Sequence, residues 1–194
     1  MSNIFTRNAV HYKTRCAWEE ERMIELKEFV LEGDVEILKK EWLYIRDLAE
    51  NENGFTNLSH GISWENFLSL YIPRRRQFVT GDGLEEEMVK QFDYLLWLDG
   101  EIVGMYRIRP ELNDFLKTVT GGHIGYGIKK EYRGKGLGTQ GLKLALEVLK
   151  TKTKDSEAYL FVHKDNPASL KVMQKNGAYI HHETDENFCT RIKL

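Results

Sequence analysis

The sequence is poor in cysteine, with two in 194 residues, Cys16 and Cys189. Neither belongs to a CxxC spacing, which excludes a disulfide scaffold and a zinc-ribbon type of site. The histidines show no metal-ligand spacing with other donors, so we expect no metal. Two ordinary thiols are typical of a protein from a reducing compartment.

Long apolar runs and an excess of one charge sign are also missing. The longest strongly apolar run, residues 94–98, lies between Asp93 and Asp99 and is far too short to cross a membrane. The first ten residues have no apolar core of signal-peptide length. The 28 basic and 30 acidic residues give a net charge of −2, so no global field attracts nucleic acid or an anionic membrane. We expect a cytoplasmic protein with a small-molecule partner, and no nucleic-acid or membrane partner.

What the chain does have is a basic, glycine-rich turn between a predicted strand and a predicted amphipathic helix. The strand should end near Ile128 and the helix should begin near Thr139. Glycines let backbone N–H groups point into a turn, and a helix N-terminus adds about half a positive charge. Arginine and lysine add fixed cations for phosphate oxygens. A phosphate-bearing ligand is therefore predicted at Arg133, Gly134, Lys135, Gly136, Leu137 and Gly138.

Two common phosphate motifs fit this turn poorly. A P-loop needs glycine at position 129 and Ser or Thr at position 136, where the chain has Lys129 and Gly136. Gly136, Gly138 and Gly141 spell the dinucleotide fingerprint G-x-G-x-x-G, but charged residues separate them from the strand and they lie deep in the chain. A nucleotide-binding enzyme is kept only as a rival for experiment.

The turn resembles the acetyl-CoA-binding motif of the GNAT N-acetyltransferase superfamily, Arg/Gln-x-x-Gly-x-Gly/Ala, through Arg133, Gly136 and Gly138. The resemblance implies that backbone amides from this turn to Thr139 bind the pyrophosphate of coenzyme A, with acetyl-CoA as acyl donor. It also implies that the strand around residues 126–128, including Ile128, pairs with the pantetheine arm. The segments 121–128 and 107–112 look like a bacterial subgroup of predicted acetyltransferases whose acceptors are mostly unassigned.

A second part of the family pattern falls on the helix expected after Asp165-Asn166-Pro167. Asn166 and Ser169 match the family pattern and are expected to bind the cofactor. Asn166 resembles the asparagine that contacts the pantetheine arm, and it can equally be a plain helix N-cap. The family's tyrosine, the usual general acid, is replaced by Met173. This departure puts the return of a proton to the leaving thiolate in doubt more than the activity.

The general base is the least defined part of the site. Where the family often has a carboxylate, this chain has Gly121, Gly122 and His123. His123 is mostly neutral at cytosolic pH and is our catalytic candidate, acting directly or through water. Its alternative role is to cap or pack the entry of the strand. Weaker candidates, recommended only by nearness to the motif, are Tyr126, Glu111 and Asp114.

Three groups of charged residues could contact a substrate or could be ordinary surface residues. Arg107 and Arg109 can reach an acidic substrate or lie on a solvated face, and we favour the solvated face. We interpret residues 74–76, three arginines, as surface charge. The acidic triplet 85–87 can attract a polyamine, but more often such a triplet favours a helix N-terminus.

The expected fold class is α/β (α+β): a GNAT fold with a mixed, mostly antiparallel central sheet flanked by helices and with splayed strands at the acetyl-CoA site. We expect one domain, 1–194, whose helical half 1–90 forms much of the acceptor side and whose part 91–194 is the acetyl-CoA-binding core. Apolar spacing and turn signals predict helices at 17–31, 34–48, 63–72, 139–150 and 166–176, and strands at 9–13, 92–98, 101–109, 123–128, 158–163, 178–183 and 188–193.

The sequence thus predicts an N-acetyltransferase that moves an acetyl group directly from acetyl-CoA to a primary amine of an unidentified small molecule or peptide. The alternative is a non-catalytic acyl-CoA-binding sensor, which the missing carboxylate and tyrosine favour. A homodimer is left open.

Overall fold

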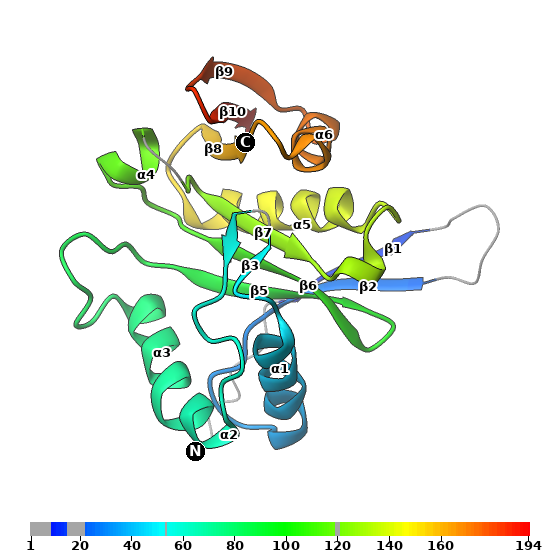
Figure 1. Ribbon diagram of the computed structural model, residues 1–194, viewed down its shortest axis with the longest axis vertical. Coiled ribbons are helices and arrows are strands. Elements are labelled where there is room, and N and C mark those ends of the chain that lie inside the picture. Colours follow the sequence, from blue (N-terminus) through cyan, green and yellow to red (C-terminus); the bar gives the residue numbers. More distant parts are fainter. Residues whose placement is uncertain (1–8, 15–21, 53, 119–120) are drawn as a thin grey trace.

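The computed structural model describes residues 9–14, 22–52, 54–118 and 121–194. Its central sheet contains β1 (Ala9–Thr14), β2 (Arg22–Glu28), β5 (Phe92–Leu98), β6 (Glu101–Ile108) and β7 (Ile124–Ile128). They lie in the order β1-β2-β5-β6-β7, and each neighbouring pair is antiparallel (Figure 1). A second sheet, in the order β8-β10-β9, contains β8 (Glu157–His163), β9 (Tyr179–Glu183) and β10 (Asn187–Lys193). A small hairpin joins β3 (Asn51–Glu52) to β4 (Phe55–Thr56).

Helices cover both faces of the central sheet (Figure 1). On one face lie α1 (Val35–Asp47), the short α2 (Trp64–Asn66) and α3 (Ile72–Thr80), over a core that includes Phe67 and Met105. On the other lies α5 (Leu137–Lys152), over a core that includes Tyr106 and Leu142. The remaining helices are α4 (Asp114–Thr118) and α6 (Pro167–Lys175). The expected α+β fold, with antiparallel sheets flanked by helices, is confirmed.

Local signals placed the turn between β5 and β6 correctly. Asp99 and Gly100 both have left-handed backbones, with φ of 49° and 85°. A two-residue hairpin turn requires this conformation at both positions, which is why Asp-Gly is favoured there. The two strands then run antiparallel from Leu98 opposite Glu101 to Phe92 opposite Ile108.

The helix expected at 17–31 is wrong, because Arg22–Glu28 is strand β2; residues 17–21, like Cys16, lie outside the described part. Ile24 and Leu26 are buried in the core, as residues two apart on one face of a strand would be. β2 pairs with β1 on one edge and with β5 on the other. These pairings outweigh the helical spacing of the apolar residues.

The helix expected to stop at Pro73 also continues. A π-helical turn, η1 (Phe67–Tyr71), precedes α3, and the amide of Ile72 donates to the carbonyl of Phe67, five residues back. Pro73 therefore falls in the first turn of α3, where a missing N–H costs little. The continued helix places Arg75 beside the buried Asp93, at 3.0 Å, so the arginine triplet is not simply surface charge.

Candidate active site

The site begins where β7 and β8 part. The amide of His123 donates to the carbonyl of Tyr159 at 2.7 Å, and an isolated bridge joins Gly122 to Leu160. In the described part of the chain no further pairing connects these strands, so they splay as expected. At one end of the β6–β7 ladder the amide of Arg109 donates to the carbonyl of His123 at 2.8 Å, and at the other the amide of Lys129 donates to the carbonyl of Val103 at 2.9 Å. Alternation then turns the backbone groups of Tyr126 towards the opening.

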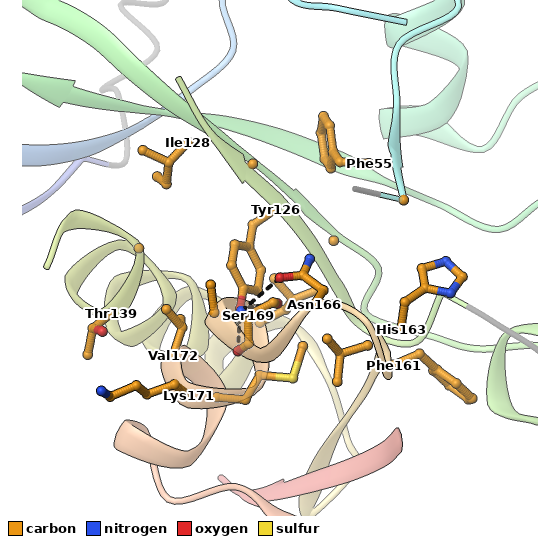
Figure 2. A pocket seen from close by; sticks show the side chains of 18 of the residues that line it. Phe55, Tyr126, Ile128, Thr139, Phe161, His163, Asn166, Ser169, Lys171 and Val172 are labelled. Carbon is orange, nitrogen blue, oxygen red and sulfur yellow. Dashed lines mark hydrogen bonds between the residues drawn. The ribbon is translucent and has the colours of Figure 1, made fainter. Parts of the chain in front are cut away.

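A cavity of about 490 Å³ occupies this opening. Of the ten residues predicted to bind the cofactor, all but Lys135 line it: Ile128, Arg133, Gly134, Gly136, Leu137, Gly138, Thr139, Asn166 and Ser169. The ammonium of Lys135 instead lies over the ring of Tyr132, 5.3 Å from its centroid. Figure 2 shows the β7, α5 and α6 sides of the cavity together with Phe55, which comes from the β3–β4 hairpin.

The glycine turn forms one end of the cavity. Gly134 and Gly136 have φ of 76° and 79°, and Gly136 precedes α5 with no side chain capping the helix. The amides of the first turn of α5, which begins at Leu137 and not near Thr139, are therefore left for a ligand. Arg133 holds the turn against β7 through a 2.8 Å bond from Nε to the carbonyl of Ile128. This open, positively polarised end fits a pyrophosphate.

Tyr126 crosses the floor of the opening from β7 to α6 (Figure 2). Its hydroxyl lies 2.8 Å from Oγ of Ser169 and donates to the carbonyl of Ser169 at 3.2 Å, while its ring stacks on Tyr106. Burial raises the pKa of Tyr126 to about 12, so the phenol stays protonated at neutral pH and cannot act as a base. The amide of Ser169 donates to Oδ1 of Asn166 at 3.1 Å, which confirms Asn166 as the N-cap of α6.

His123, the catalytic candidate, lies outside the cavity wall and is fully buried. Its Nδ1 accepts the amide of Tyr159 at 2.9 Å, so Nε2 carries the proton and donates to Oδ2 of Asp155 at 3.0 Å. Burial lowers the pKa of His123, and Asp155 partly opposes this. No lone pair of the ring is left to receive a proton from an acceptor. The catalytic role stays a prediction that this geometry disfavours, and its contacts match the alternative, packing at the strand entry.

The sequence interpretation of Arg107, in β6, and Arg109, just after it, was wrong. Both side chains line the cavity and do not lie on a solvated face. Arg107 donates from Nη1 to the carbonyl of Thr56 at 2.7 Å, and its guanidinium lies 4.5 Å from the centroid of Phe55. Arg109 donates from Nη1 to the carbonyl of Gly122 at 3.2 Å. Side chains alternate between the two faces of a strand, so Arg107 and Arg109 point away from the face that buries Tyr106 and Ile108. This alternation could have indicated that the two arginines share one face.

Carboxylates are missing from the cavity wall: in the described part no Asp or Glu lines it, and Glu111 and Asp114 are exposed elsewhere. Glu85 pairs with Arg74 at 2.6 Å, and no helix begins at the acidic triplet, so that expectation was also wrong.

The cavity has no negatively charged side chain among the described residues. Its cations come from both ends and from α6: Arg107, Arg109, Arg133, Lys171 and Lys175. Residues that sequence reasoning did not place in the site include Gly54, Phe55, Thr56, Phe161, His163, Lys171 and Asn187.

Two further properties concern the described residues only. They contain no group of three or more His, Cys, Asp or Glu side chains arranged to hold a metal ion. None of their helices combines the length and the apolar character that a membrane crossing needs.

The chain is similar to known acetyltransferases. The model of a family described as "Acetyltransferase (GNAT) family" matches residues 63–178. The "Probable spermine N(1)-acetyltransferase" of Bacillus subtilis subsp. natto (strain BEST195) is 31% identical over 94 residues. These residues cover 47% of this chain and 62% of that protein, so the chain spans less than two thirds of its length.

Solved structures share the fold at low identity. Campylobacter jejuni N-acetyltransferase PseH in complex with acetyl coenzyme A has a TM-score of 0.55 and 18% identity, covering 88% of this chain and 99% of that one. The ribosomal-protein-S5-alanine acetyltransferase of Vibrio fischeri has a TM-score of 0.58 and 12% identity, covering 95% and 96%.

Proposed function

The chain belongs to the acetyltransferase (GNAT) family. We propose that it uses acetyl-CoA as acyl donor and moves the acetyl group directly to a primary amine of a small molecule or peptide. One observation carries the proposal: nine predicted cofactor-binding residues and the open edge of β7 line one continuous cavity. The donor binds at one end, and the β3–β4 hairpin leaves room for an acceptor at the other.

In this proposal the chain mainly binds and orients. The amides of Gly138 and Thr139 hold the pyrophosphate, and the backbone of Tyr126 aligns the pantetheine arm along β7. Bound acetyl-CoA supplies the activated thioester. The described cavity wall has no carboxylate and its histidine, His163, is exposed, so in this proposal the proton that the amine loses passes to solvent water. Met173 provides no acid, but a thiol with a pKa of about 8.5 gives a thiolate that is a fair leaving group.

The domain arrangement is part of the same proposal. We infer that residues 1–194 form one domain in which 1–90 supply much of the acceptor side and 91–194 the acetyl-CoA-binding core. Its support is that β1 and β2 belong to the same sheet as β5 to β7, and that Phe55 and Thr56 line the cavity. A cytoplasmic location and a homodimer remain proposals.

The experiment is to follow release of the coenzyme A thiol from acetyl-CoA with a panel of amines. Steady release that depends on one amine, with one acetylated product per thiol, supports the proposal. Acetyl-CoA binding with no release for any amine contradicts it. The reaction without the protein gives the background rate, and Gly136→Val, in which donor binding is expected to weaken, should release thiol more slowly.

A second candidate is a non-catalytic acyl-CoA sensor. One observation favours it: Met173 stands where the family pattern has tyrosine, is 2% exposed and contacts Oγ1 of Thr190 through sulfur at 3.4 Å. A sensor binds acetyl-CoA and acetylates nothing. The thiol assay separates the two.

A further inference from the structure

The cavity holds two groups of cations that are far apart along β7. Arg109 lies one residue past the ladder, where its amide donates to the carbonyl of His123, whereas the phosphate end lies beyond Ile128. Five residues at about 3.4 Å each put roughly 17 Å between these two points of the strand. Arg109 is therefore too distant to serve the pyrophosphate site, and Arg107, opposite Gly125, is about 10 Å from Ile128 along the strand. Both arginines belong to the end beneath the β3–β4 hairpin, where Arg107 contacts Phe55 and Thr56.

Arg109 carries a charge that no carboxylate pairs with in the described part of the chain. Among the described residues the guanidinium makes one hydrogen bond, at 3.2 Å to the carbonyl of Gly122, and no ion pair with a carboxylate. Burial, with a smaller effect of neighbouring Arg107, lowers the pKa of Arg109 to about 10, so the side chain is still charged at neutral pH. A partly buried, unpaired cation is costly, and a bound anion would offset that cost.

The nearest acid does not neutralise this end of the cavity. Asp93 is buried and already takes Arg75 at 3.0 Å, the amide of Gln91 at 3.0 Å and Nε of Arg107 at 3.8 Å. Two guanidiniums, those of Arg75 and Arg107, therefore share one carboxylate, and no ion pair joins Arg109 to it. The N–H groups of Arg109 that make no bond to Gly122 remain for a ligand.

This charge pattern opposes a polyamine, whose several ammonium groups need carboxylates that the described cavity wall lacks. We propose that the acceptor is an amine that also carries a carboxylate, such as a free amino acid, and that Arg109 binds this carboxylate. The inference rests on the proposed acetyl transfer and names the acceptor class. A guanidinium suits the task because its planar fork matches a carboxylate.

The test uses acceptors matched except for the carboxylate: lysine with cadaverine, ornithine with putrescine and β-alanine with ethylamine, plus spermine. At saturating acetyl-CoA, kcat/KM should be about tenfold or more higher for the carboxylated member of the productive pair, because charge-assisted hydrogen bonds are strong. Equal values, or a preference for the diamines or spermine, would overturn the inference.

Variants assign the preference to Arg109. Arg109→Gln should lower kcat/KM for the carboxylated acceptor about tenfold or more and that for its partner little, with the Kd for coenzyme A unchanged. Arg109→Lys keeps the charge and should retain part of the preference. Arg76→Gln is the matched control, since Arg76 is half-exposed on α3 and pairs with Glu32 away from the cavity. An equal loss for both acceptors in Arg109→Gln would contradict the proposal.

A binding measurement on the wild-type protein needs neither turnover nor a folded variant. With coenzyme A present, N-acetyl-β-alanine should raise the thermal midpoint more than N-ethylacetamide, its analogue without the carboxylate. Equal midpoints would overturn the carboxylate site. If coenzyme A itself gives no shift, the proposed function fails first, and this inference falls with it.

Discussion

The shape of the phosphate end depends on two glycines of the turn, Gly136 and Gly138. Gly136 has φ of 79° directly before α5, and Gly138 lies where a Cβ would come within 3.4 Å of Val172. A side chain in a left-handed backbone is strained by about 1–2 kcal/mol. At Gly136 it would also crowd the amides that face the ligand.

Replacing Gly136 by Val should raise the Kd for coenzyme A at least about tenfold, because strain and the added side chain both disturb the cradle. Calorimetric titration measures this. Gly61→Val is the control, since Gly61 has a comparable φ of 72°, has open space at its Cβ and does not line the cavity. Wild-type affinity in Gly136→Val would refute the assignment of the turn.

The buried His123 makes stability depend on pH. Because burial lowers its folded-state pKa below the unfolded value, its contribution is fully present above about pH 6.5 and is lost as the pH falls through that value towards the folded-state pKa. Between about pH 7 and 5 the thermal midpoint of wild type should fall more than that of His123→Gln. His163→Gln, which alters an exposed histidine, should behave as wild type. A steeper fall in His123→Gln would contradict this.

Turnover separates the two roles of His123. If the residue only holds the β7–β8 junction, His123→Gln protein that is still folded should keep its Kd for coenzyme A and most of its kcat. A loss of kcat without a loss of stability or donor affinity would restore the catalytic prediction.

At the scale of elements, the opening between β7 and β8 is fixed by one junction. Gly122 has φ of 63°, and a Cβ there would collide with the carbonyl oxygen of Tyr159. That carbonyl also accepts the amide of His123. Close backbone contact at this point and separation beyond it together create the cavity.

Gly122→Ala should therefore destabilise the protein by at least about 2 kcal/mol and weaken coenzyme A binding. Gly100→Ala is the matched control: Gly100 has φ of 85° in the β5–β6 turn and open space at its Cβ, so it should cost only about 1 kcal/mol. Urea unfolding and titration measure both effects. Equal costs for the two variants would mean that the Tyr159 contact is unimportant.

Elements with local signals could be predicted from the sequence: the Asp99-Gly100 turn, the glycine turn and the Asn166 cap each depend on neighbouring residues alone. β2 and the π-helical turn could not, because their conformations depend on β1, β5 and packing in the core. The same limit applies to the site. The phosphate end is one contiguous segment, whereas the acceptor end combines Phe55 with Arg109, which are distant in sequence.

At the scale of the whole molecule, net charge and local charge differ. The chain carries −2 overall, yet the described cavity wall has cations and no carboxylate. Such a concentration of positive charge attracts a polyanionic donor and, at the far end, an anionic acceptor group. The near-neutral composition, read alone, gave no sign of this.

The most direct test of coenzyme A binding is the thermal midpoint with acetyl-CoA, free coenzyme A, NAD and ATP side by side. At about 100 times Kd a ligand stabilises the folded state by about 2.7 kcal/mol, which corresponds to a rise of roughly 5–10 °C for a chain of this size. We predict such a rise with both coenzyme A species and none with NAD or ATP. A rise with NAD or ATP, and none with coenzyme A, would contradict the account.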